Sequence, residues 1–172
     1  MFDWIVHYIA AGTLAVVFVL AMGHKLRNYA RFRASLQAYG IVPEFLLGFV
    51  GPFIVLLEAL AVLCLLLPLG PGSLLAFAVL GVYSVAMGTN LLRGRKYIDC
   101  GCGDLPTPLS GWLLLRNLML MALAWPYALP AGYAGSAWAW SLVTVVVLVL
   151  VVFYLTIEQL LANDGLIELD HG

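Results

Sequence analysis

Two cysteines stand one residue apart in a short charged stretch of an otherwise apolar chain. Residues 93–104 read RGRKYIDCGCGD, which places Cys100 and Cys102 on either side of a glycine. A glycine lets the backbone turn tightly without Cβ strain, and a disulfide across so small a ring departs from relaxed geometry. Because strained disulfides are the more easily reduced ones, this spacing favours a redox pair over a structural bridge.

Positive charge precedes the two thiols. Arg93, Arg95 and Lys96 come just before them, and a helix expected to begin near Ser110 would add the positive end of its dipole. Both features stabilise a thiolate, which is the form that attacks disulfides. The carboxylate of Asp99, next to Cys100, would either oppose this effect or carry a proton.

Other interpretations of the cysteines stay open. They are either ordinary loop residues beside a cationic membrane face or, with His24, ligands of a soft metal ion. A closed zinc site needs four ligands and the chain offers few candidates, so we assign no metal ligands. The third cysteine, Cys64, is expected roughly 20 Å or more away along another helix, and we interpret it as a packing residue.

The composition is that of a membrane protein. Of 172 residues, 64% are hydrophobic and 10% are charged, and the mean hydropathy is +1.04. A soluble domain of this size exposes too much surface to hide so many apolar side chains, so the lipid bilayer is the expected surrounding. The net charge of −1 argues against a nucleic-acid partner. The chain carries no phosphate-binding loop, HExxH or GxSxG motif.

Five apolar segments are long enough to be membrane spans, which need roughly 20 residues. They cover residues 4–22, 45–67, 73–92, 111–129 and 138–161. Backbone groups in lipid must be satisfied within each segment, so we predict helices. The expected fold is all-α: a polytopic membrane bundle with a core of four helices (4–129), a fifth C-terminal span and a short interfacial helix. We treat residues 1–172 as one domain with a loose polar tail at 163–172. Because no basic residues precede the first segment, we expect it to be retained and not cleaved as a signal peptide.

The connections differ in character. The uncharged PLGPG at 68–72 predicts a tight hairpin between the second and third spans. The longer segment 24–44 predicts an amphipathic interfacial helix. Its apolar face would contain Leu26, Tyr29, Leu36 and Tyr39, and Gly40 would end it as a C-cap.

All eight Lys and Arg residues lie in or beside two connections, at 25–33 and 93–116. Antiparallel helices bring these two connections to the same end of the bundle. The positive-inside rule predicts that this end, with its thiols, is cytoplasmic.

Several polar residues fall within the predicted spans. Glu58 lies deep in the second span, where a carboxylate indicates either function or interhelical hydrogen bonding, with Thr13 and Ser84 as the expected neighbours. Arg116 lies near the start of the fourth span and would extend toward the cysteine loop, where Asp99 or Asp104 could pair with it.

Two asparagines complete this set. Asn117 and Asn90 are expected at the cysteine end, where they would either form a polar cup around the thiols or serve ordinary helix packing.

Taken together, GHKLRN, Pro43, Glu58 and the run NLLRGRKYIDCGCGD resemble the methylamine utilisation protein MauE family, within the wider DoxX-like membrane proteins. The resemblance covers about residues 5–130. The family has a phenylalanine after the second cysteine, whereas here Cys102 is followed by Gly103 and Asp104. It implies a membrane protein needed to mature methylamine dehydrogenase, with the thioredoxin-like protein MauD as partner. A looser likeness to vitamin K epoxide reductases implies a quinone as the electron partner, and no other cofactor is indicated.

We therefore predict a multi-pass protein of the bacterial inner membrane that exchanges electrons with a thioredoxin-like partner through Cys100 and Cys102. As an enzyme it would be a membrane thiol–disulfide oxidoreductase. The remaining alternatives are a soft-metal or small-solute transporter with Glu58 on its pathway, and a non-catalytic maturation scaffold. The resemblance places the thiols on the periplasmic face, opposite to the face that the charge count favours.

Overall fold

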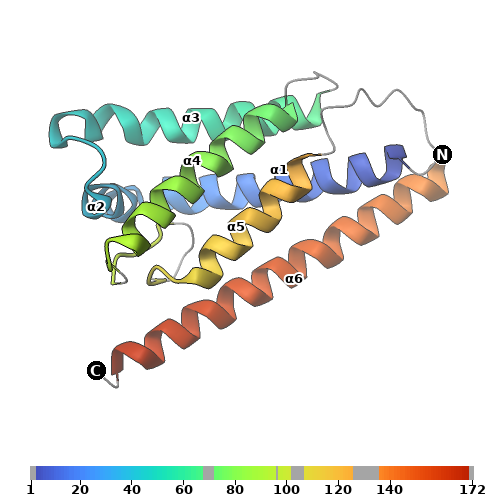
Figure 1. Cartoon of the computed structure of the whole chain (residues 1–172). Coiled ribbons are helices and arrows are strands. Elements are labelled where there is room, and N and C mark those ends of the chain that lie inside the picture. The colour runs from blue at the N-terminus through green and yellow to red at the C-terminus, as the bar shows by residue number, and fades with distance from the viewer. Residues whose placement is uncertain (1–2, 68–71, 96, 102–106, 126–135, 171–172) are drawn as a thin grey trace.

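The computed structural model describes residues 3–67, 72–95, 97–101, 107–125 and 136–170, and these ranges are helical almost throughout (Figure 1). They contain no β-strand, only an isolated bridge between Asp99 and Pro108. The predicted all-α fold is confirmed. The elements in chain order are α1 (Asp3–Arg27), α2 (Tyr29–Tyr39), the 3₁₀ turn η1 (Glu44–Leu46), α3 (Leu47–Leu66), α4 (Gly72–Leu92), α5 (Gly111–Ala124) and α6 (Ala137–Asp170).

Four helices are long and apolar enough to cross a bilayer: α1, α3 (with η1), α4 and α6. The chain is therefore a multi-pass membrane protein. The predicted span 111–129 corresponds to α5, which has 14 residues and extends about 21 Å at 1.5 Å per residue. That is shorter than a hydrocarbon core of about 30 Å, and residues 126–129 of the predicted span lie outside the described ranges.

The C-terminal part of α6 differs from the expectation of a loose tail. The helix continues through the polar segment to Asp170. This segment contains no proline, so no residue removes a helical hydrogen bond. Once a helix is established, each added residue gains one more hydrogen bond, and the polar residues extend it.

Small side chains form the centre of the bundle. Ala10 and Leu14 of α1, Ala61 of α3 and Ala76 of α4 are at most 1% exposed, and they belong to one buried cluster. In lipid, small residues let helix backbones approach closely and so gain packing energy. The same device joins α1 to α6, because a Cβ added at Gly12 would lie 3.0 Å from Cγ2 of Val147. Helix α1 thus packs against both α3 and α6.

The junction of α3 and α4 supports the predicted hairpin. A Cβ at Gly72 would lie 2.4 Å from the carbonyl oxygen of Cys64, so the start of α4 touches the end of α3 and requires glycine. This junction lies at the opposite end of the bundle from the α4–α5 connection that carries Cys100 (Figure 1). Cys64 is therefore remote from the cysteine loop, as expected.

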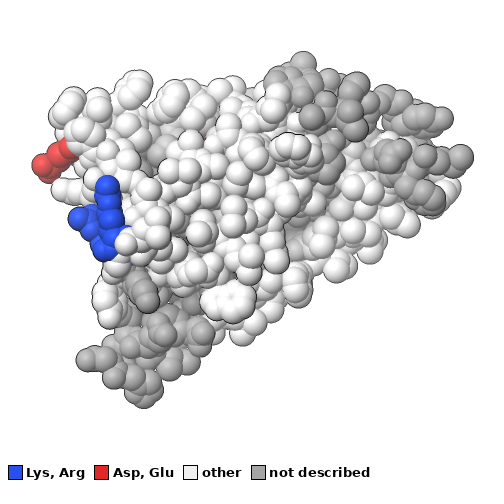
Figure 2. Space-filling view, viewed as in Figure 1, with Lys and Arg blue, Asp and Glu red and all other residues white. Residues whose placement is uncertain are grey.

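The interfacial helix is present as α2, and its buried face agrees with the predicted one at Tyr39 but not at Leu26. Phe32, Ser35 and Tyr39 are buried, whereas Leu26 is 59% exposed and belongs to α1. Gly40 ends α2 with φ 62° and donates its N–H to the carbonyl of Gln37, which confirms the predicted C-cap. Lys and Arg side chains gather at one end of the surface in the view of Figure 2. The two charged connections meet, because Arg31 pairs with Asp99 and a Cβ at Gly40 would lie 3.0 Å from Nη1 of Arg95.

Candidate functional site

The loop between α4 and α5 is held in a defined shape near Cys100. The N–H of Cys100 donates to the carbonyl of Thr107 (2.9 Å), and the N–H of Leu109 donates to the carbonyl of Ile98 (3.0 Å). These bonds form the Asp99–Pro108 bridge. The backbone before and after the undescribed residues 102–106 is therefore paired.

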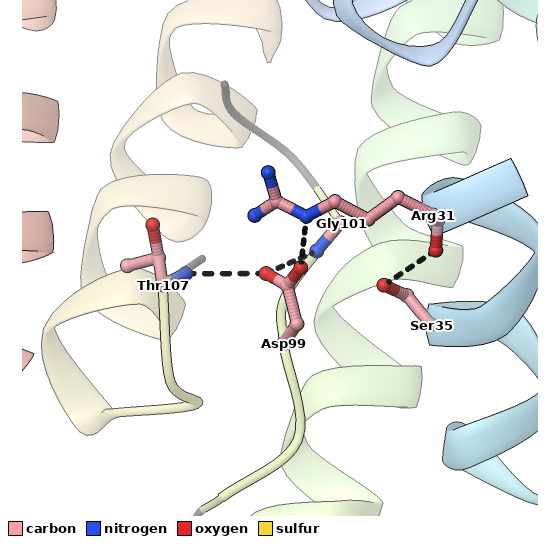
Figure 3. Close-up of polar contacts among 5 residues, drawn as sticks. All are labelled: Arg31, Ser35, Asp99, Gly101 and Thr107. Atoms are coloured by element: carbon pink, nitrogen blue, oxygen red, sulfur yellow. Dashed lines mark hydrogen bonds and ion pairs between the residues drawn. The ribbon is translucent and has the colours of Figure 1, made fainter. Parts of the chain in front are cut away.

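The side chain of Asp99 anchors this loop (Figure 3). Its Oδ1 accepts hydrogen bonds from the backbone N–H groups of Gly101 (3.2 Å) and Thr107 (3.1 Å). Its Oδ2 accepts one from Nε of Arg31 on α2 (2.8 Å). The predicted pair of Asp99 with Arg116 is wrong, because Arg31 is its ion-pair partner. Asp104, the other partner expected for Arg116, lies outside the described residues.

Gly101 lets the loop lie close against α2. Its φ is 68°, a left-handed conformation that side chains disfavour, and a Cβ there would lie 3.1 Å from Cβ of Ser35. The hydroxyl of Ser35 donates to the carbonyl of Arg31 (Figure 3). Arg31 and Ser35 were not expected in the site. Their i, i+4 spacing, which places both on one face of α2, is the signal that could have indicated them.

Cys100 is 7% exposed and packs with Tyr39, Met87, Leu109 and Leu113. It is disulfide-bonded, whereas Cys64 is a free thiol. Cys102 and Lys96 lie outside the described residues, so the pairing of Cys100 with Cys102 stays a prediction.

Tyr39 contributes a neutral hydroxyl to this cluster. Burial, and then the negative charge of Asp99, raise the pKa of Tyr39 above its ordinary value. The phenol therefore keeps its proton beside Cys100 at any physiological pH.

The remaining predicted site residues occupy different surroundings. Arg93 and Arg95 are exposed at the end of α4, and their effect on a thiolate stays a prediction. Arg116 pairs with Glu158 of α6 (3.5 Å) and lies 5.3 Å from the ring centroid of Tyr154. In the described structure, Arg116 therefore connects α5 to α6.

The two asparagines make different contacts. The amide of Asn117 donates to the carbonyl of Leu80 and to the hydroxyl of Ser84, each at 2.8 Å, and joins α5 to α4. The amide of Asn90 donates to the carbonyl of Ala86, within α4. The Asn117 contacts match the helix-packing alternative, and a polar cup around the thiols stays a prediction.

A second cluster of polar side chains, separate from the cysteine loop, lies inside the bundle. Glu58, which is 0% exposed, forms an ion pair with Lys25, which is 4% exposed. The hydroxyl of Tyr83 donates to the same carboxylate oxygen of Glu58 (2.6 Å), and Lys25 also donates to the oxygen of Tyr83 (3.2 Å). We call Lys25, Glu58 and Tyr83 the buried triad.

The expected neighbours of Glu58 were wrong. The hydroxyl of Thr13 donates to the carbonyl of Ile9, and that of Ser84 donates to Sδ of Met121. Counting turns assumed that every helix begins at one height. Instead α3 extends beyond the end of α1 (Figure 1). Glu58 forms an ion pair with Lys25, which lies near the C-terminal end of α1. The pair of Lys25 with Glu58 could have been predicted from the rule that a buried charge needs a buried counter-charge.

A cavity of about 420 Å³ lies between the buried triad and the cysteine loop. Lys25 and Tyr83 of the triad line it, as do Cys100 and Gly101 of the loop. Phe32 lies between them: Nζ of Lys25 is 5.5 Å from its ring centroid, and a Cβ at Gly101 would be 3.8 Å from its Cδ2. About one aromatic ring thus separates the cysteine loop from the triad.

Comparison with known proteins places the chain in a family. The model of the methylamine utilisation protein MauE family matches residues 3–130. The methylamine utilization protein MauE of Paracoccus denitrificans is 39% identical over 129 residues, which cover 72% of this chain and 69% of that protein.

Two further MauE proteins agree with this match. That of Methylophilus methylotrophus is 34% identical over 116 residues, which cover 64% of this chain and 60% of the relative. That of Paracoccus versutus is 28% identical over 143 residues, 77% of each. No solved structure matches. Together with the membrane helices and the cysteine loop, these matches show that the chain belongs to the methylamine utilisation protein MauE family.

Proposed function

We propose that this chain is a membrane thiol–disulfide redox protein that serves methylamine utilisation. Membership of the MauE family implies a role in that system, and the four long apolar helices imply that it acts in a membrane. The observation that carries the redox activity is the disulfide-bonded Cys100, in a loop anchored by three hydrogen bonds to Asp99.

The reaction is thiol–disulfide exchange between the Cys100–Cys102 disulfide and a partner dithiol. A partner thiolate attacks one sulfur, a mixed disulfide forms, and the other sulfur leaves as a thiolate. The second partner thiol then resolves the mixed disulfide, so two electrons enter this protein and the partner becomes oxidised. Because Cys100 is 7% exposed, we assign Cys102 as the sulfur that the partner attacks and Cys100 as the sulfur that leaves as a thiolate.

The partner that fits is a thioredoxin-like protein of the MauD type, in the periplasm beside the inner membrane. Disulfides persist in that compartment, and methylamine dehydrogenase is the enzyme whose maturation would be served. Exposed Arg93 and Arg95, with Lys96, would stabilise the thiolate or receive an acidic partner surface.

The proposal is tested by replacing each cysteine. Cys100→Ser and Cys102→Ser should each abolish methylamine dehydrogenase maturation in cells that lack the native gene, while Cys64→Ser should retain it. Mixed with the oxidised thioredoxin-like partner, Cys100→Ser should form a mixed disulfide by attack of the Cys102 thiolate on the partner disulfide, which Cys100 can no longer resolve, and non-reducing gels and mass spectrometry would detect it. Full maturation by both loop variants would show that the redox reading is wrong.

A further inference from the structure

The cavity beside Cys100 has the size and form of a small-molecule site. Its volume of about 420 Å³ is within the 300–1,000 Å³ usual for such sites. Most of its wall is apolar, formed by side chains such as Ile54 and Leu57 of α3 and Ala86 and Met87 of α4. A ligand here would therefore be mostly hydrocarbon or aromatic.

The wall also carries a hydrogen-bond donor at the triad. An ammonium group has three N–H donors, and in the described structure Lys25 directs two of them to Glu58 and Tyr83. Its third N–H makes no hydrogen bond to a described residue, and Lys25 is among the residues that line the cavity. Because Lys25 is 4% exposed, a hydrogen bond from it would be shielded from water. The cavity thus suits an apolar molecule with an acceptor oxygen.

The cavity opens toward lipid. Val82 of α4 and Phe53 of α3 line it and are 65% and 45% exposed. Both lie on candidate membrane spans, so their exposed surfaces face the hydrocarbon of the bilayer. A ligand would enter from the membrane and not from water.

A redox-active cysteine in the same wall identifies the chemistry of the ligand. The electrons that a dithiol partner delivers to Cys100 and Cys102 must leave to an acceptor of two electrons and two protons. Such an acceptor must be soluble in lipid, carry an oxygen for Lys25 and be flat enough to lie beside Phe32. A lipid acyl chain fits the apolar wall but neither the donor nor the redox requirement.

We infer that this cavity binds a membrane quinone, which reoxidises the Cys100–Cys102 pair. This inference rests on the proposed function and gives it a direction, from the partner dithiol through the cysteines to the quinone. In the step, the two thiols lose two electrons and two protons and an S–S bond forms. The two carbonyl oxygens of the quinone receive them and become the hydroxyl groups of a hydroquinone.

Two valines of α4 provide a matched test. Val82 and Val85 are 65% and 67% exposed, but only Val82 is among the residues that line the cavity. A tryptophan at either position faces lipid without disturbing the bundle core. Val82→Trp should obstruct the mouth of the cavity, and Val85→Trp is the control.

The experiment uses the reduced full-length protein in lipid nanodiscs with a short-chain ubiquinone analogue. Hydroquinone is followed by absorbance and the cysteines by alkylation and mass spectrometry. Wild-type protein should form one hydroquinone per disulfide. Val82→Trp should slow this step by about tenfold or more, and Val85→Trp should leave it unchanged. Oxidation by glutathione disulfide, a water-soluble oxidant, should be equal in all three proteins. The quinone should also raise the unfolding temperature of the wild type more than that of Val82→Trp.

The outcomes separate the two proposals. If the quinone is not reduced, or if both tryptophan variants slow equally, or if a fatty acid alone occupies the cavity, the quinone site is overturned. In those cases exchange with the thioredoxin-like partner still supports the proposed function. If neither glutathione disulfide nor the quinone oxidises the cysteines to a disulfide, the proposed function itself fails.

Discussion

Two of the ion pairs in the described part of the chain differ mainly in burial. Lys25 and Glu58 are 4% and 0% exposed, whereas Arg31 and Asp99 are 31% and 22% exposed. Both join segments far apart in the chain. Each pairs one cationic side chain with one carboxylate, so the contrast shows what burial does to a salt bridge.

In the buried triad each charge depends on the other. Removing one partner leaves an ion inside the bundle without water or counter-charge, which is strongly destabilising. Replacing both partners with apolar residues removes that penalty. The triad therefore determines whether α1, α3 and α4 assemble correctly.

At the cysteine loop the Coulomb attraction matters less, because water screens partly exposed charges. Asp99 acts chiefly as a hydrogen-bond acceptor for the backbone N–H groups of Gly101 and Thr107. This pair therefore determines the shape of a loop and leaves the stability of the bundle largely unaffected.

The largest expected effect comes from breaking the triad. Glu58→Leu and Lys25→Met should each lower the free energy of unfolding by about 3–5 kcal/mol, while the double variant should recover most of that loss. Glu58→Gln should also be destabilised, because it leaves Lys25 without a counter-charge. Equilibrium unfolding in detergent micelles measures this cycle. Strictly additive losses in the double variant would show that the two side chains do not interact.

Removal of the Asp99 side chain should come next. Asp99→Ala deprives two backbone N–H groups and Arg31 of their acceptor and should cost about 1–3 kcal/mol locally. Asp99→Asn keeps an oxygen for the backbone bonds and should cost less. Hydrogen exchange at Gly101 and Thr107, with the alkylation rate of reduced Cys100, reports the loop. Equal damage by both variants would mean that the charge, and not the acceptor geometry, shapes the loop.

Gly101→Ala should have a somewhat smaller effect, of about 1–2 kcal/mol for the left-handed backbone, increased by contact with Ser35. Gly94 is the matched control, since its φ is 71° and a Cβ there would meet nothing within 4 Å. Only Gly101→Ala should displace the loop from α2 and speed alkylation of reduced Cys100. If Gly94→Ala does the same, then backbone strain and not docking on α2 is responsible.

The smallest effect on stability is expected for Arg31→Gln. An ion pair this exposed contributes about 0–1 kcal/mol, and raising the salt concentration should weaken it further. Arg33→Gln, an exposed arginine on the same helix, is the control. If Arg31→Gln lowered the free energy of unfolding as much as Glu58→Leu, the two ion pairs would be equally stabilising, which would contradict the difference argued from their burial.

Several features were readable from local sequence. The apolar runs predict the spans because a bilayer demands uninterrupted hydrophobic helices. Gly40 predicts the end of α2 because glycine adopts the left-handed C-cap. The Cys-Gly-Cys spacing pointed to the loop that the structure shows anchored by Asp99 and packed on α2.

The partners of the polar residues were not readable. Arg116 was expected at Asp99 and is found with Glu158, and Glu58 was expected with Thr13 and is found with Lys25. The prediction for Glu58 assumed helices of equal extent, and that for Arg116 assumed that it extends toward the nearby carboxylates of the cysteine loop. The offset of α3 relative to α1, and the length of α6, set the true neighbours.

The sequence by itself determined that this is a membrane helix bundle with a pair of thiols in a charged loop, because hydropathy, glycine positions and cysteine spacing act over a few residues. Only the tertiary structure decided which cation meets which carboxylate, since Lys25 and Glu58 are 33 residues apart and Arg31 and Asp99 are 68 apart. Tertiary packing also created the cavity between Cys100 and the triad. Such contacts depend on the tilt and offset of the packed helices. Tilt and offset result from the close packing of many side chains at once, so no single stretch of sequence encodes them.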